Sequence, residues 1–171
     1  MKIIKFGIVI LLVSLSFSAC EKDDICVDAD TPLLIIRFYD ANDTTAFKPI
    51  AGLRIIGLGK DVPINTFSDR SNDLDSIAIP LKINNTLTGF TFIKDSADDE
   101  DGNEAGNSDI VNFSYEVTDE YISRACGFIA NYNNLNTEFT TTPENWIQGI
   151  KIVKPSIEIE ETVTAHVKIF H

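Results

Sequence analysis

The stretch Val111-Asn112-Phe113-Ser114-Tyr115-Glu116-Val117 decides the fold class. Its apolar side chains alternate with polar ones, and this two-residue period is typical of a β-strand with one buried face and one face in water. We therefore expect its valines and aromatic rings to point into a core, while the polar side chains between them face solvent.

Further β-rich runs lie on both sides of this stretch and are separated by clusters of Gly, Pro, Asn and Asp. The expected runs are 33–39, 53–58, 77–81, 90–94, 112–117, 122–132, 149–153 and 157–169. The alternation in the last run places His166 on the exposed face. Thr141 and Glu144, at capping-box spacing, predict a turn before Trp146, whose ring we expect to pack in or beside the core. The sequence thus predicts one all-β domain, an antiparallel β-sandwich with an Ig-like or similar Greek-key order.

The first two dozen residues have the order of a bacterial secretory signal. Lys2 and Lys5 precede an apolar run at 6–15, and Ala19 lies just before Cys20. A membrane span needs roughly 20 apolar residues, and serines interrupt this run well before that length. Small residues followed by a cysteine resemble the lipobox of bacterial lipoproteins. The resemblance implies cleavage after Ala19 and acylation of Cys20, with palmitate or a similar chain.

The residues after this cysteine sharpen the prediction of location. Glu21-Lys22-Asp23-Asp24 resembles the export tag of Bacteroidota surface lipoproteins, in which Lys22, Asp23 and Asp24 would direct the protein to the outer face. The chain then divides into a signal peptide at 1–19, an acylated acidic tether at 20–31 and the β-sandwich domain at 32–171. We expect a lipid anchor in the outer membrane that faces the cell exterior. The alternative, a solvated tether facing the periplasm, stays open.

Acidic residues outnumber basic ones, with 26 Asp and Glu against 14 Lys and Arg and a formal net charge of −12. Removal of the signal peptide takes away Lys2 and Lys5 and no acid, so the mature charge becomes −14. Nucleic-acid binding needs a basic footprint, which argues against nucleic acid as a partner.

The chain has three cysteines, and acylation of Cys20 leaves Cys26 and Cys126 as a pair. Disulfides persist outside the cytoplasm, so we expect these two to be bridged. Closing a loop of about 100 residues is worth about 4.7 kcal/mol in the chain-entropy model. A buried free thiol or a reactive nucleophile at Cys126 stays open, and the nucleophile would need His166 or His171 as its base.

The acid-rich segment between Asp95 and Asp109 contains the candidates for a cation site. Asp98, Asp99 and Asp101 are potential Ca²⁺ ligands, since hard cations bind clustered oxygen atoms. An EF-hand register fails, because it places alanine and serine at the first and last ligand positions. A solvated loop between two strands is therefore the preferred interpretation.

Three tripeptides resemble the O-glycosylation acceptor of exported Bacteroidota proteins. They begin at Asp43, Asp75 and Asp95, and the resemblance implies Thr44, Ser76 and Ser96 as the modified hydroxyl groups. The same residue types also form ordinary turns, because their side chains bond nearby backbone groups.

The sequence has no glycine-flanked nucleophile motif, metal-spaced His/Cys set, phosphate loop or dinucleotide fingerprint. The leader, Arg124-Ala125-Cys126-Gly127-Phe128 and the ending 165–171 resemble a family of small flavobacterial lipoproteins, which implies location and fold class only. We expect a non-enzymatic accessory or interaction module of the cell envelope that binds an envelope protein and needs no cofactor. The alternative is a Ca²⁺- or glycan-binding module that uses the acidic loops and Trp146.

Overall fold

The computed structural model describes Cys26 and residues 31–159 and 164–171. The strands are β1 (Leu34–Tyr39), β2 (Arg54–Gly57), β3 (Ser76–Ile79), β4 (Leu87–Lys94), β5 (Asn107–Ser123), β6 (Gly127–Glu138), β7 (Gly149–Ile152) and β8 (Val167–Phe170). Strands and turns make up the described part, and no helix that could span a membrane occurs in it.

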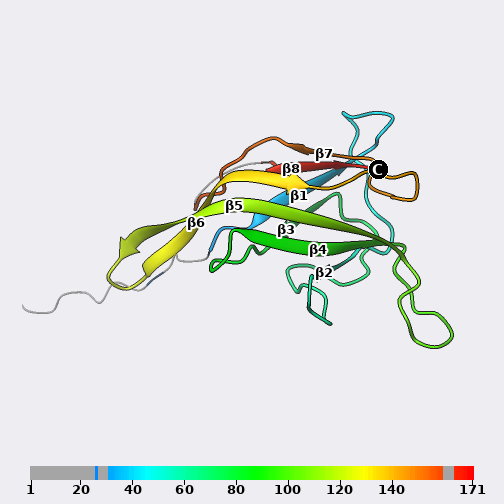
Figure 1. The fold of residues 1–171 in the computed structure, drawn as a ribbon, viewed down its shortest axis with the longest axis horizontal. Helices are drawn as coiled ribbons and strands as arrows, with labels where there is room; N and C mark the ends of the chain where they lie inside the picture. Colours follow the sequence, from blue (N-terminus) through cyan, green and yellow to red (C-terminus); the bar gives the residue numbers. More distant parts are fainter. Residues whose placement is uncertain (1–25, 27–30, 160–163) are drawn as a thin grey trace, which may run out of the picture.

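Two four-stranded sheets pack together, which confirms the predicted all-β sandwich (Figure 1). The first sheet has the order β3-β1-β8-β7 and the second has the order β2-β4-β5-β6. The chain changes sheets between β1 and β2, β2 and β3, β3 and β4, and β6 and β7. Only the second sheet therefore contains a continuous meander of three strands, β4 to β6.

One ladder departs from the predicted antiparallel arrangement. β1 pairs in parallel with β8, and Ile36 lies opposite Val167, whereas the other ladders between the named strands are antiparallel. Parallel neighbours need a long connection, and here that connection is almost the whole domain. No local pattern of residues could have revealed this pairing.

The apolar side chains of the two inner faces form one core. The stretch 111–117 faces it as predicted, because Val111, Phe113 and Tyr115 are at most 3 % exposed. Val117 is partly buried and packs against the edge of the same cluster. The first sheet contributes Leu34, Ile36, Phe38, Ile77, Ile79, Val167 and Ile169. Full burial of such a side chain contributes roughly 1.5–3 kcal/mol, so these layers dominate the stability of the fold.

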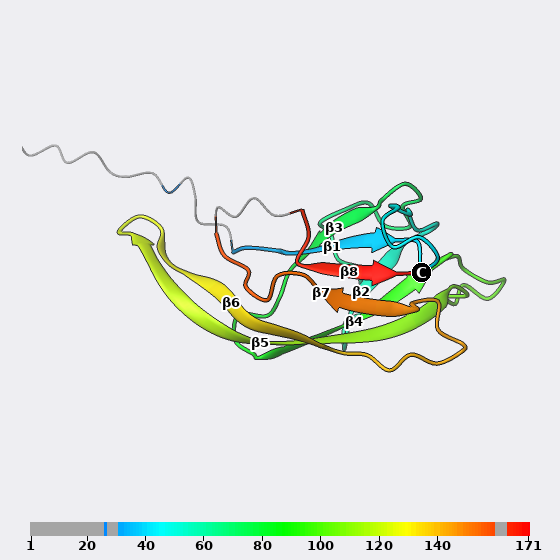
Figure 2. The same ribbon diagram turned by 90° about the horizontal axis from the view of Figure 1, so that it is seen from above.

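β5 and β6 form a long hairpin whose outer part, residues 116–133, extends beyond the sandwich (Figures 1 and 2). We call this part the arm. The continuous run expected at 122–132 is wrong, because a turn at 124–126 separates β5 from β6. Gly127 follows the turn with a φ of +72°, which a residue with a Cβ rarely adopts.

A β-bulge marks the place where the arm leaves the sandwich. The register passes from Ser114 opposite Asn136 to Glu116 opposite Asn133, so one residue of β5 faces two of β6. One of the two, Asn134, has a φ of +53°, in the left-handed region that asparagine tolerates better than most residues. Bulges bend a hairpin and increase its twist, and in Figure 2 the arm curves toward the beginning of β1.

The C-terminal run departs from its expected alternation at His166. This residue is 2 % exposed, so the prediction of an exposed side chain is wrong. Its side-chain Nδ1 accepts a hydrogen bond from the backbone N–H of Ile35 (3.0 Å), and the backbone N–H of His166 donates to the Ile35 carbonyl oxygen (2.9 Å). The chain bends immediately before β8, so the alternation of β8 does not extend back to His166.

The turn before Trp146 is present but is closed by other residues than expected. Asn145 Oδ1 accepts a hydrogen bond from Thr142 Oγ1 (2.8 Å), so Thr141 and Glu144 do not form the predicted capping pair. Trp146 is 7 % exposed, and its Nε1–H donates to the carbonyl oxygen of Phe92 (3.3 Å). Its ring packs in the core, as predicted.

Candidate interaction surface beside the arm

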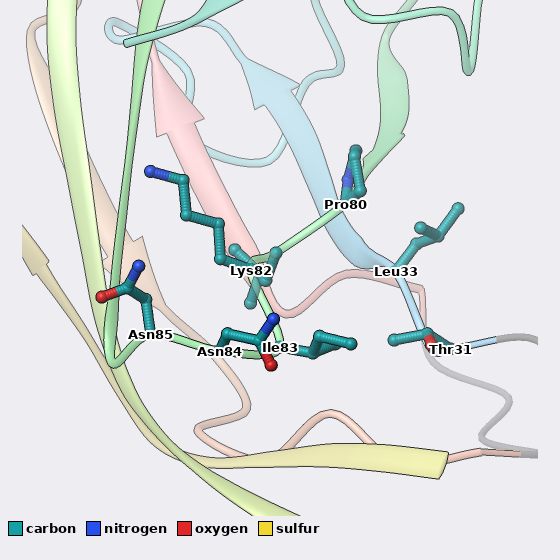
Figure 3. Close-up of a pocket in the computed structure, with 8 residues that line it drawn as sticks. Thr31, Leu33, Pro80, Lys82, Ile83, Asn84 and Asn85 are labelled. Carbon is teal, nitrogen blue, oxygen red and sulfur yellow. The ribbon is translucent and has the colours of Figure 1, made fainter. Parts of the chain in front are cut away.

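A hollow of about 570 Å³ lies at the end of the sandwich from which the arm extends (Figure 3). The segment before β1 forms one side, and the loop between β3 and β4 forms the other. Its lining residues are Thr31, Leu33, Pro80, Leu81, Lys82, Ile83, Asn84 and Asn85. Figure 3 shows Ile83 and Thr31 pointing toward one another across it. Apolar walls with a few amide and charged groups are typical of a ligand-binding site.

A second hollow, of about 350 Å³, adjoins the first, because Thr31, Ile83 and Asn84 line both. The inner face of the arm forms its other wall, with Val117, Asp119, Phe128, Ile129 and Ala130. Phe128 is 69 % exposed and Ile83 is 51 % exposed, so both walls present apolar side chains to solvent. We call the two hollows together the arm groove.

Buried hydroxyl groups fix the floor of the arm groove. The Tyr115 hydroxyl donates to the Lys82 carbonyl oxygen (2.8 Å) and lies 2.5 Å from Thr88 Oγ1. The Tyr132 hydroxyl donates to the Leu81 carbonyl oxygen (3.2 Å). Burial raises the pKa of Tyr115 and raises the pKa of Tyr132 to about 12. Both phenols are therefore neutral donors at neutral pH, and they hold the loop after β3 in place.

The arm also presents a backbone edge. β4 pairs with β5 only as far as Leu87 opposite Ser114. Beyond that point, β6 is the only strand that pairs with residues 116–123 in the part of the chain that the structure describes. A strand edge of this kind is a template on which another strand can be added.

A disulfide joins the tip of the arm to the tether. Cys26 and Cys126 are bonded, with an S–S distance of 2.06 Å and Cα atoms 4.9 Å apart, as expected from the cysteine count. Cys126 lies in the turn between β5 and β6, and Cys26 belongs to the tether that precedes β1. The bond therefore connects the tether to the farthest point of the hairpin.

A family model matches residues 52–171, which include the arm, most of the arm groove and Cys126. The chain belongs to this family of unknown function, DUF6452. The comparisons with curated proteins and with solved structures found no match. The DUF6452 segment begins after β1, so Cys26 and the tether precede it.

The acidic loop of this DUF6452 member, residues 95–106, lies at the end of the molecule away from the arm tip (Figure 1). Its carboxylate Glu104 accepts hydrogen bonds from Arg54 Nη1 (3.0 Å), Ser96 Oγ (2.7 Å) and the Gly106 N–H (2.9 Å). Burial raises the pKa of Glu104, but these hydrogen bonds outweigh burial and hold the pKa below its usual value. The charge is thus used to close the loop.

The calcium candidates in this loop bind protein groups and do not converge. Asp98 contacts Arg70 through both carboxylate oxygens, and this hydrogen bonding lowers the pKa of Asp98. Asp99 accepts from the backbone N–H groups of Asp101 (3.0 Å) and Asn103 (2.7 Å), and the Asn103 backbone bond lowers its pKa most. Within the described residues, no group of three or more His, Cys, Asp or Glu side chains is placed to hold a metal ion.

The three glycosylation candidates differ in exposure. Thr44 is exposed, and Ser76 is half-buried in β3. Ser96 is 8 % exposed, and its Oγ accepts from Arg70 Nε (3.1 Å) while it donates to Glu104. A glycan on Ser96 would break both hydrogen bonds, so its surroundings argue against Ser96 as an acceptor.

Proposed function

We propose that the protein is a Bacteroidota surface lipoprotein, anchored in the outer membrane by an acylated Cys20 and facing the cell exterior. The support is the lipobox and the tag Lys22-Asp23-Asp24, all of which lie outside the described residues. Acyl chains contribute about 0.8 kcal/mol per buried methylene, so a cysteine with two or three chains would anchor the protein stably.

We further propose that the anchored domain binds an extended segment of another envelope protein and does not turn over a substrate. The observation that carries this proposal is that the free edge of β5 lies beside the arm groove. A strand added along residues 116–123 would direct every second side chain toward the inner face of the arm. Backbone hydrogen bonds would supply affinity, and the groove would select side chains.

The chemistry of the arm indicates what such a segment contains. Ile83 and Val117 offer apolar contact within the groove. Glu116 and Asp119 are exposed carboxylates along the free edge. Complementary charges increase the rate and specificity of association, so the partner segment would combine apolar residues with lysine or arginine.

Photo-crosslinking in intact cells tests the proposed partner. A photoreactive phenylalanine analogue replaces Asp119 in the groove. As a matched control, the analogue replaces Asp73, an exposed acid in the loop that contains Arg70, whose side chain bonds Asp98 at the acidic end. We expect a specific adduct with an envelope protein from position 119 only. Equal adducts from both positions, or none from position 119, would refute strand capture by the arm.

Two further measurements test the anchor and the surface location separately. Cys20→Ala should release the protein from the membrane fraction, and protease added to intact cells should cleave the anchored protein. Retention of the Cys20→Ala variant would refute the anchor. Full protection of the anchored protein from protease would instead refute exposure to the cell exterior.

A further inference from the structure

The tip of the arm carries two exposed aromatic rings. Tyr121 and Phe128 lie opposite each other in the hairpin, and their ring centroids are 5.3 Å apart in an edge-to-face arrangement. They are 54 % and 69 % exposed, although each is large and mostly apolar. Arg124 is the single charged residue between positions 121 and 128, and it is exposed. Aromatic rings beside a basic residue are the composition that favours the interface between lipid and water.

The disulfide holds this tip near the proposed lipid anchor. Cys26 follows Cys20 by six positions, and six residues span at most about 20–22 Å. The Cα atoms of Cys26 and Cys126 are 4.9 Å apart, so the tip stays within a short reach of the acylated residue. Without the bond, the covalent path from Cys20 to the β-sandwich would run through Thr31, eleven positions away and just before β1.

We infer that the tip of the arm docks on the lipid bilayer, with the rings of Tyr121 and Phe128 among the headgroups and Arg124 beside the phosphates. This inference rests on the proposed acylation of Cys20. A tethered tip meets the bilayer at high effective concentration, so a shallow contact of two rings is sufficient. Asp119 and Glu120, exposed immediately behind the tip, limit its depth.

The charge distribution agrees with this orientation. The acidic loop at 95–106 lies at the far end of the molecule from the tip (Figure 1). Anionic lipids repel carboxylates and attract basic groups near the surface. The domain would therefore stand on the membrane by its arm, with the acidic end directed away and the free edge of β5 close to the bilayer.

Fluorescence quenching tests the docking with full-length protein isolated from the membrane fraction. The protein is reconstituted in phosphatidylethanolamine and phosphatidylglycerol vesicles with plain or brominated acyl chains. Phe128→Trp places an indole at the tip, and Phe47→Trp, at a ring that is 50 % exposed in the loop after β1, is the matched control. The parent protein supplies the baseline, since its single tryptophan, Trp146, is buried.

We expect brominated lipid to reduce the added emission of Phe128→Trp about twofold or more, because an interfacial ring lies close to the upper acyl chain, and to leave Phe47→Trp unchanged. Combining Phe128→Trp with Cys26→Ser and Cys126→Ser should lose most of this quenching. If brominated lipid does not quench the added emission of membrane-bound Phe128→Trp, the docking is wrong while the anchor stands. The exposed rings of the tip would then be assigned to contact with a protein partner. Absence of the parent protein from the membrane fraction would overturn the anchor and the docking together.

Discussion

The two ends of the sandwich use their surface residues in different ways. At the acidic end, Arg54 and Arg70 bind Glu104 and Asp98, so charges that are abundant in the sequence are paired within the domain. At the arm end, large apolar side chains such as Phe128 face solvent, and β5 extends beyond its β4 partner. Paired charge closes a loop, whereas an uncovered strand edge beside an apolar groove is what another molecule can bind.

The backbone of the acidic loop supports the same distinction. A Cβ added to Gly106 would lie 2.8 Å from the Lys94 carbonyl oxygen and 2.9 Å from the Ser96 Cα, so the base of this loop is closely packed. Composition makes this loop a candidate cation site, because six of the seven acids between Asp95 and Asp109 lie within it. The structure uses several of those acids to hold the loop together.

Removal of the disulfide should have the largest effect and tests whether the arm end depends on a covalent bond. Replacing both Cys26 and Cys126 by serine should lower the free energy of unfolding by up to about 4.7 kcal/mol, because the open chain gains conformational entropy. Urea unfolding of the purified protein measures the loss, with Cys20→Ser as the control. A loss below about 1 kcal/mol would show that the tether and arm unfold independently of the sandwich.

The two buried histidines make the stability of the fold depend on pH. Burial, with a smaller contribution from Lys154, lowers the pKa of His166 from 6.5 to about 4, and burial also lowers the pKa of His171. The unfolded chain binds a proton at higher pH than the folded one. The contribution of neutral His166 to the free energy of unfolding is therefore fully present above pH 6.5. It is lost as the pH falls toward 4, by up to roughly 3 kcal/mol.

Between pH 6.5 and pH 4, the free energy of unfolding should therefore fall more steeply with falling pH for the parent than for His166→Gln. Denaturant unfolding at several pH values measures this. Burial lowers the pKa of His171 as well, so His171→Gln should also reduce the dependence on pH. An unchanged pH slope in His166→Gln would show that His166 is not held neutral by the fold.

A smaller effect is expected at the acidic end. Glu104→Gln removes the charge that accepts hydrogen bonds from Arg54 and Ser96, and should cost about 1–2 kcal/mol of unfolding free energy. Asp73→Asn, at an exposed acid, should change stability by less than about 0.5 kcal/mol. Equal effects of the two substitutions in thermal melts would mean that the charge pairing does not close the loop.

The smallest effect on stability is expected at the arm tip. Tyr121→Ser combined with Phe128→Ser should change the free energy of unfolding by about 0.5 kcal/mol or less, since both rings are mostly in solvent. Phe113→Ala, in the core, should cost about 3–5 kcal/mol in the same assay. A large loss from the tip variant would assign its rings a packing role and remove the main reason for placing them at a membrane.

The core strands could be predicted from the sequence because their signal is local. The alternation of Val111, Phe113 and Tyr115 matches their burial on one face of β5. His166 departs from such a pattern because its burial depends on a contact with Ile35, which is 131 positions away. The parallel pairing of β1 with β8 has the same origin in distant parts of the chain.

The arm could not be predicted from the sequence, for a different reason. The turn at 124–126 contains no Gly, Pro, Asn or Asp, and only the following Gly127 is a typical turn residue. Because β-rich sequence flanks it on both sides, the turn cannot be recognised from the sequence. Asn133 and Asn134 are a usable signal for the bulge, since two adjacent asparagines follow the expected run 122–132 and one takes a positive φ. The arm groove has no local signal, because residues before β1, after β3 and on the arm meet only in the fold.

Hydrogen exchange tests the central claim, that the arm end is the interacting end, most directly. Backbone amide exchange is compared between the purified full-length protein in detergent and the same protein in its native membranes. We predict slower exchange in the membranes over 116–128, where a partner strand and lipid would cover the arm, and unchanged exchange over 95–106. Unchanged exchange over the arm, or protection confined to the acidic loop, would contradict the account.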